Sequence, residues 1–228
     1  MTTAVAAPVR WAGLSAIGAG LIFAAIQPIH PPDTLASVGT TAWAFIQSLK
    51  LAMCVLFLLG VAGLYARQQR KTGWLGLAGF LALFVSWVLQ AGFVFTSALV
   101  LPQVAATAPD FVAGFLGIAS GAATTGIGML PQLYLAVGLL YLLGGVLFGV
   151  ATFRARVLPR AAGALLALGA VLPLLFSTVV SHPYDRYFAI PVALAFVWMG
   201  YALFTESRRQ VIETTTGPAT PAFTPRAS

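Results

Sequence analysis

Apolar residues fill six long runs of the chain, and short polar segments separate these runs. A helix needs about 20 apolar residues to cross the roughly 30 Å of hydrocarbon in a bilayer. The pattern therefore predicts an all-α, polytopic membrane protein with six transmembrane helices in one bundle, a single domain over residues 1–205. The expected spans are about 11–29, 42–66, 74–101, 130–153, 161–181 and 187–205.

The composition agrees with lipid as the solvent. The 228 residues are 60% hydrophobic and 7% charged, with a mean hydropathy of +0.95. Soluble domains carry roughly a quarter charged residues, so this chain has too few to cover a water-soluble globule. Its net charge of +7 comes from short basic clusters between the apolar runs, with no basic stripe for nucleic acid. A single cysteine, Cys54, excludes an intramolecular disulfide and a CxxC metal site.

Positive charges indicate the orientation of the bundle, because cytoplasmic loops are enriched in Arg and Lys. With six spans, ten basic residues fall on the side shared by both termini, and Arg186 falls on the other side. The ten are Arg10, Arg67, Arg70, Lys71, Arg154, Arg156, Arg160, Arg208, Arg209 and Arg226. Both termini are therefore expected to be cytoplasmic, and residues 206–228, rich in Thr and Pro, to form a disordered cytoplasmic tail.

The first apolar run also fits a signal peptide, because Arg10 precedes it. The run is long for a signal peptide, however, and the segment "PIHPPDTLAS" has no convincing A-x-A cleavage site. We expect the first span to be retained.

Polar side chains concentrate in the outer half of the predicted bundle. Gln27 and His30 are three residues apart, as are Gln47 and Lys50, so each pair shares a helix face. We expect a ligand-binding polar pocket on the extracytoplasmic side, formed by Gln27, His30, Gln47, Lys50, Gln90, Gln132, His182 and Asp185. The alternative for Gln27, Gln90 and Gln132 is hydrogen bonding between helices inside the membrane.

Among the polar residues in these runs, Lys50 has the highest free-energy cost of insertion into the membrane. A lysine at the centre of a span costs about 2.5–3.5 kcal/mol on insertion scales, and such residues are often functional. The alternative is that its stem extends toward the nearer interface, with Gln47 accepting a hydrogen bond one turn away. The sequence leaves both interpretations open.

The two histidines lie in similar segments, "IHPPDT" and "SHPYDR". Proline disfavours helix in the preceding residue, so His30 and His182 should end helices, and Asp33 and Asp185 are placed to cap the next helical segments. This explains the prolines and aspartates without requiring histidine. A functional interpretation is a metal site of His30, His182, Asp33 and Asp185, holding Zn²⁺, or a haem ligated by the two histidines. We expect no cofactor, with zinc and haem as the alternatives.

Two further features concern packing. Glycines recur at Gly73, Gly76 and Gly79 and at Gly145 and Gly149, spacings that let helices approach closely, either within the monomer or in a homodimer. The long segment 102–129 contains "DFVAGFLGIASG", which predicts a short helix on the outer leaflet.

One segment resembles a known kind of protein. The stretch "LLYLLGGVLFGVATFRARVLPRAAGALLALGAVL", residues 139–172, has a glycine-rich span, a short basic turn and an alanine- and leucine-rich span. It resembles an uncharacterised family of bacterial, actinobacterial-type multi-pass membrane proteins. The resemblance implies residence in a bacterial cytoplasmic membrane and implies no activity.

The polar residues favour a non-enzymatic function. A conducting path would ordinarily need polar groups through both halves of the membrane. We expect a binding, sensing or accessory protein with an outward-facing pocket, in contact with lipid and with a membrane-protein partner or a second copy of the chain. The alternatives are a small transporter or exporter of an apolar or lipid-like solute, and a metal- or haem-dependent membrane enzyme using His30 and His182.

Overall fold

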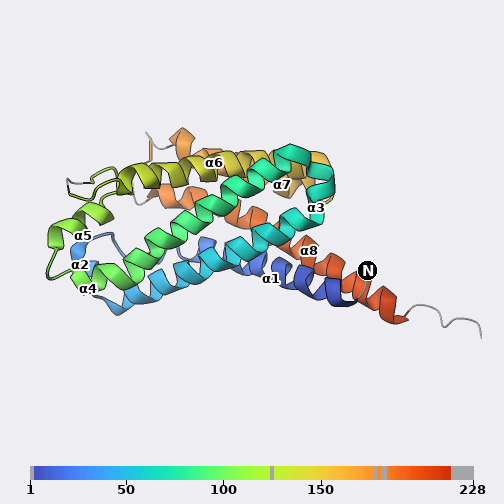
Figure 1. The fold of residues 1–228 in the computed structure, drawn as a ribbon, viewed down its shortest axis with the longest axis horizontal. Coiled ribbons are helices and arrows are strands. Elements are labelled where there is room, and N and C mark those ends of the chain that lie inside the picture. The colour runs from blue at the N-terminus through green and yellow to red at the C-terminus, as the bar shows by residue number, and fades with distance from the viewer. Residues whose placement is uncertain (1–2, 124–125, 177–178, 181–183, 217–228) are drawn as a thin grey trace, which may run out of the picture.

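The protein is helical throughout the part that the structure describes. A computed structural model describes residues 3–123, 126–176, 179–180 and 184–216, and these contain helices and turns and no strand (Figure 1). The α-helices are α1 (Thr3–Ala25), α2 (Leu35–Val38), α3 (Thr41–Phe95), α4 (Leu101–Val104), α5 (Pro109–Leu116), α6 (Leu130–Ala155), α7 (Arg160–Phe176) and α8 (Ile190–Thr216). Two helices of other geometry join them, the π-helix η1 (Thr96–Val100) and the 3₁₀-helix η2 (Tyr184–Ala189).

Four helical stretches of the described chain are long and apolar enough to cross a membrane. They are Pro8–Ala25, Thr41–Val104, Leu130–Ala155 and Tyr184–Ser207, and α7 is a shorter apolar helix. The expectation of an all-helical chain with membrane-length apolar helices is therefore confirmed.

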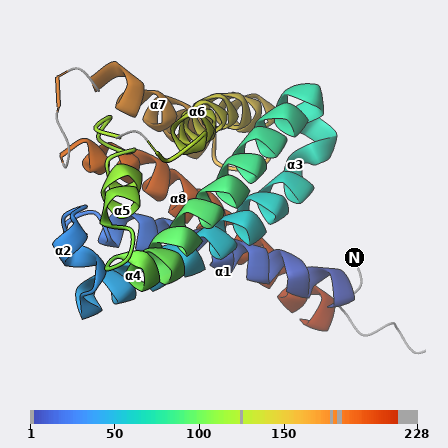
Figure 2. The same ribbon diagram turned by 60° about the vertical axis from the view of Figure 1, so that its left-hand side comes forward.

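Helix α3 is a hairpin of two arms, 41–72 and 74–95. The backbone leaves helical geometry at Gly73, where φ is 55°. Only glycine adopts such an angle readily, so the reversal falls on this residue. Figures 1 and 2 both show the two arms side by side in opposite directions. The basic segment 67–71, expected as a loop, continues the first arm instead, because Arg, Gln and Lys are good helix formers.

The bundle has two distinct ends. The start of α1, the Gly73 reversal, the α6–α7 connection and the end of α8 lie at one end, which we call the reversal end (Figure 1). Helices α2, α4 and α5 lie at the opposite end, the loop end (Figures 1 and 2). This arrangement places the first and last described helices side by side.

Small residues allow the helices to touch along their backbones. A Cβ added to Gly13 in α1 would lie 2.9 Å from the carbonyl oxygen of Gly200 in α8. A Cβ at Gly149 in α6 would lie 2.6 Å from the carbonyl oxygen of Gly163 in α7. Gly145 and Gly149 of α6 therefore pack against α7 inside the monomer, and Gly79 lies against the backbone of Phe148.

The last helix is longer than the sequence predicted. Helix α8 continues to Thr216, so residues 206–216 of the expected disordered tail are helical, and residues 217–228 lie outside the described part. Glu206 accepts two hydrogen bonds from the Arg67 guanidinium, at 2.9 and 2.5 Å, and this ion pair joins α8 to the first arm of α3 at the reversal end.

A polar cavity at the loop end

The described residues enclose a cavity of about 390 Å³ near the loop end. Its walls come from the end of α1, both arms of α3, α5 and α6, with the segment after α1 and η2 contributing charged residues. Small-molecule sites in proteins are commonly about 300–1,000 Å³, so this cavity is large enough for a small ligand.

Most of the pocket residues predicted from the sequence line this one cavity. Those that do are Gln27, His30, Gln47, Lys50, Gln90 and Asp185. Gln132 does not line it: this residue lies in the first turn of α6 with its side chain exposed. His182 lies outside the described residues, so the structure says nothing of its distance from His30.

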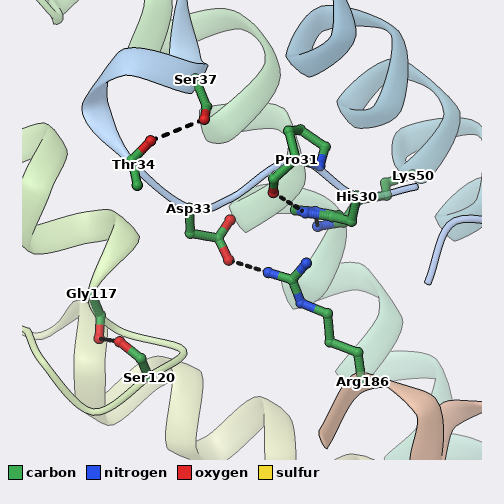
Figure 3. A network of polar contacts seen from close by, with 9 residues as sticks. All are labelled: His30, Pro31, Asp33, Thr34, Ser37, Lys50, Gly117, Ser120 and Arg186. Atoms are coloured by element: carbon green, nitrogen blue, oxygen red, sulfur yellow. Dashed lines mark hydrogen bonds and ion pairs between the residues drawn. The ribbon is translucent and has the colours of Figure 1, made fainter. Parts of the chain in front are cut away.

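Lys50 and His30 are joined by a hydrogen bond across the cavity wall. The Lys50 Nζ lies 3.3 Å from His30 Nε2, and His30 Nδ1 lies 2.7 Å from the carbonyl oxygen of Pro31 (Figure 3). An ammonium group only donates, so Nε2 accepts and Nδ1–H donates to Pro31, which defines a neutral imidazole. Burial, together with the positive charges of Lys50 and Arg186, lowers the pKa of His30 to about 4, against the opposing effects of Pro31 and Asp33. His30 is therefore uncharged at neutral pH.

Asp33 and Arg186 connect two distant parts of the chain at the same cavity. The Arg186 Nη2 lies 2.5 Å from Asp33 Oδ2, and both side chains are mostly buried, with exposures of 14% for Arg186 and 21% for Asp33 (Figure 3). Asp33 therefore does not cap α2: the residue at the N-cap position is Thr34. The pair holds the segment after α1 against η2. Asp185 lies beside Arg186 in the first turn of η2.

Two buried polar atoms at the cavity lack a partner among the described residues. They are Gln47 Oε1, an acceptor, and Trp87 Nε1, a donor. Their side chains are only 1% and 4% exposed. A buried polar group without a hydrogen bond costs about 1–3 kcal/mol, and such groups in native proteins call for an explanation.

Aromatic packing fixes the position of Trp87. Its ring stacks on Phe57 with centroids 4.0 Å apart and meets Phe23 and Tyr141 edge to face at 5.7 and 6.0 Å. The indole cannot turn to find another partner without disturbing these contacts. Its N–H group is therefore fixed in position without a partner among the described residues.

A second tryptophan is fixed through the π-helix. Trp43 Nε1 donates to the carbonyl oxygen of Ser97 in η1, at 2.9 Å, and Trp43 is 1% exposed. A π-helix has i→i+5 hydrogen bonds in place of the usual ladder and occurs often at functional sites. Ser97 also lines the cavity. The bond thus ties the first arm of α3 to η1 beside the site.

The loop segment after α4 covers the cavity. Phe115, Leu116 and Ile118 line it and belong to a buried apolar cluster at the loop end that also includes Trp43. The short helix expected within 102–129 is α5, with Asp110 in its first turn and Ala108 at the N-cap position. Helix α5 covers the cavity at the loop end.

On the other side, a packed apolar layer closes the cavity toward the reversal end. Phe57, Val61, Leu64, Leu83 and Phe148 are all fully buried there. Toward the reversal end, Gln68 Nε2 donates a hydrogen bond to Thr152 Oγ1, at 2.9 Å. The cavity therefore lies in one half of the bundle.

Two residues of the alternative metal site, His30 and Asp33, make other contacts. Both His30 nitrogens take part in hydrogen bonds, and Asp33 pairs with Arg186. Among the described residues, no group of three or more His, Cys, Asp or Glu side chains is arranged to hold a metal ion. The expected set included His182, which the described part of the chain leaves out.

Some cavity residues were not anticipated. Trp43 lies four residues before Gln47, and Trp87 three residues before Gln90, so helical spacing could have placed both tryptophans on the same faces as the glutamines. Arg186 gave no such signal, because its partner lies in a remote segment.

No protein-family model, curated protein or solved structure matches the chain.

Proposed function

We propose that the chain crosses a bacterial cytoplasmic membrane six times, with both termini in the cytoplasm. In this arrangement each arm of α3 crosses once, and α1, α6, α7 and α8 supply the other crossings. Basic residues near the helix ends support the orientation, because Arg67, Arg70, Lys71 and Arg154 gather at the reversal end. The cavity then lies in the extracytoplasmic half of the bundle.

In this membrane the protein serves as a non-enzymatic binding protein for a small amphiphilic molecule. The supporting observation is the pair of buried, unpartnered atoms at the cavity, the acceptor Gln47 Oε1 and the donor Trp87 Nε1, neither of which has a partner among the described residues. These polar side chains in the cavity wall favour a ligand with a hydrogen-bonding head group, and the aromatic walls favour an apolar part on the same ligand. Binding would serve sensing or the activity of a partner protein.

The packed layer beneath the cavity supports binding over transport. A substrate pathway would need to continue between Phe57, Leu83 and Phe148, which are fully buried. The described side chains of this layer are apolar, and the hydrogen bond between Gln68 and Thr152 lies beside it. Transport remains an alternative that requires a second conformation of this layer.

Cysteine labelling tests the orientation. The natural Cys54 is fully buried, so single cysteines can be introduced into the native chain. A membrane-impermeant maleimide should label a Thr34→Cys variant in intact cells and a Lys71→Cys variant only after permeabilisation. The opposite pattern would overturn the proposed topology.

Native mass spectrometry tests the binding. Full-length protein released from mild detergent should carry a bound small molecule, and Gln47→Leu should lose most of it. Gln132→Leu is the matched control, because it removes the same amide outside the cavity. Equal loss from both variants, or no retained molecule in the wild type after extraction directly from membranes, would count against the proposal.

A further inference from the structure

The charge at the cavity identifies the chemical class of the ligand. We propose that the cavity recognises a monoanionic amphiphile, a molecule with one carboxylate and an apolar body, and that the Lys50 ammonium binds the carboxylate. This inference rests on the binding function proposed above and adds the charge of the ligand to it.

Lys50 has no counterion among the described residues. Its hydrogen-bond partner is His30, which accepts through Nε2 and is neutral. The ion pair that the described residues form at the cavity joins Arg186 to Asp33 instead. A buried ammonium group normally has an anionic partner, because removing a charge from water is unfavourable unless an opposite charge compensates it.

Lys50 is a cation at the cavity that forms no ion pair within the described residues. Asp33 attracts its ammonium group and Arg186 repels it, and these two groups are paired with one another. One carboxylate on a ligand supplies the partner that Lys50 lacks. The formal charges of Lys50, Arg186, Asp33 and Asp185, which all line the cavity, sum to zero, so the cavity disfavours a dianion such as a phosphate monoester.

The position of Lys50 gives the ligand its orientation. Gln47 lies one turn from Lys50 on the same arm of α3, toward the loop end, and Trp87 lines the cavity from the other arm. The remaining walls near them are apolar or aromatic, with Phe23, Met53 and Tyr141 among the lining residues. A carboxylate at Lys50 therefore places an apolar body against these rings.

His30 positions Lys50 for this contact. By accepting one N–H of the ammonium, the neutral imidazole restricts the lysine side chain and leaves its other two N–H groups for the ligand. An anionic partner at this position would neutralise the Lys50 ammonium group in the absence of ligand. The neutral partner holds the ammonium without neutralising it.

Direct binding of radiolabelled octanoate to the purified full-length protein tests the inference. Octanoate should bind saturably, and neither 1-octanol nor octylammonium should compete at equal free concentration. Lys50→Met should weaken octanoate binding by about tenfold or more, because the buried carboxylate loses its cation. Lys50→Arg, which keeps the charge, should retain most of the binding.

Lys71→Met is the matched control, because it removes a lysine charge on the reversal side of the molecule, away from the cavity. It should bind octanoate as the wild type does. If 1-octanol competes as well as octanoate, or if Lys50→Met binds octanoate normally, the anion inference is overturned while the binding function stands. If none of the three eight-carbon probes binds saturably, the binding function itself fails.

Benzoate distinguishes the source of the carboxylate. Competition by benzoate equal to that of octanoate supports a water-soluble organic acid from outside the cell. A strong preference for octanoate supports a fatty acid from the membrane. Both results support recognition of a carboxylate, and failure of both unlabelled acids to displace bound octanoate would overturn it.

Discussion

Replacing Gln47 with leucine should stabilise the ligand-free protein. The Gln47 side chain is 1% exposed, and its Oε1 has no partner among the described residues. Leucine has a similar size, is a good helix former and carries no polar atom. Removing a buried, unsatisfied polar atom should recover about 1–3 kcal/mol. A gain of about 2 kcal/mol corresponds to a rise in Tm of about 4–8 °C for a chain of this size.

The assay is thermal unfolding of purified protein in detergent after bound small molecules have been removed. Gln68→Leu is the matched control, because Gln68 is also buried with an Oε1 that lacks a partner in the described part of the chain, but lies outside the cavity. Its Nε2 donates to Thr152, so leucine there loses a hydrogen bond, and the two effects should nearly cancel. A Gln47→Leu variant less stable than the wild type by about 1 kcal/mol or more, on the order of one hydrogen bond, would refute the reasoning.

Three other contacts lead to predictions of their own. The pKa of His30 is about 4 in the folded protein against the ordinary 6.5, so the unfolded chain binds a proton first and stability falls as the pH drops from about 6.5 to 4. The loss should approach about 3 kcal/mol, and His30→Gln should remove this component from the Tm–pH profile, whereas parallel profiles would contradict it. In a double-mutant cycle, Asp33→Asn and Arg186→Gln should show a coupling energy of about 1–2 kcal/mol, and additive effects on unfolding would mean that the pair contributes nothing. Gly149→Ala should destabilise the bundle by about 1–3 kcal/mol because its Cβ meets the α7 backbone, whereas Gly92→Ala, with open space around it, should leave Tm unchanged or raise it.

Helical spacing and charge predicted much of the cavity. Gln47 and Lys50 were placed together because residues three apart share a helix face, and the structure puts both on the cavity wall. The same rule could not place Gln132, because the direction in which the first turn of a helix faces depends on the neighbouring helices. Its side chain is exposed instead.

Contacts between remote segments were beyond prediction from a single sequence. Asp33 and Arg186 are 153 residues apart, and nothing local distinguishes a pairing aspartate from a helix cap. The role of Trp87 depends on its packing against Phe57 and Tyr141, and a tryptophan in an apolar run can equally face lipid. The reversal at Gly73 falls later than expected because the preceding basic residues extend the helix.

The most direct test of an outward-facing binding cavity is the reactivity of a cysteine placed inside it. Ser97→Cys introduces a thiol at the cavity wall with little change in size, and the natural Cys54 is fully buried. In intact cells, a membrane-impermeant thiosulfonate should modify this thiol, and saturating octanoate should slow the reaction. Modification only after permeabilisation, or at a rate that octanoate does not change, would contradict the account.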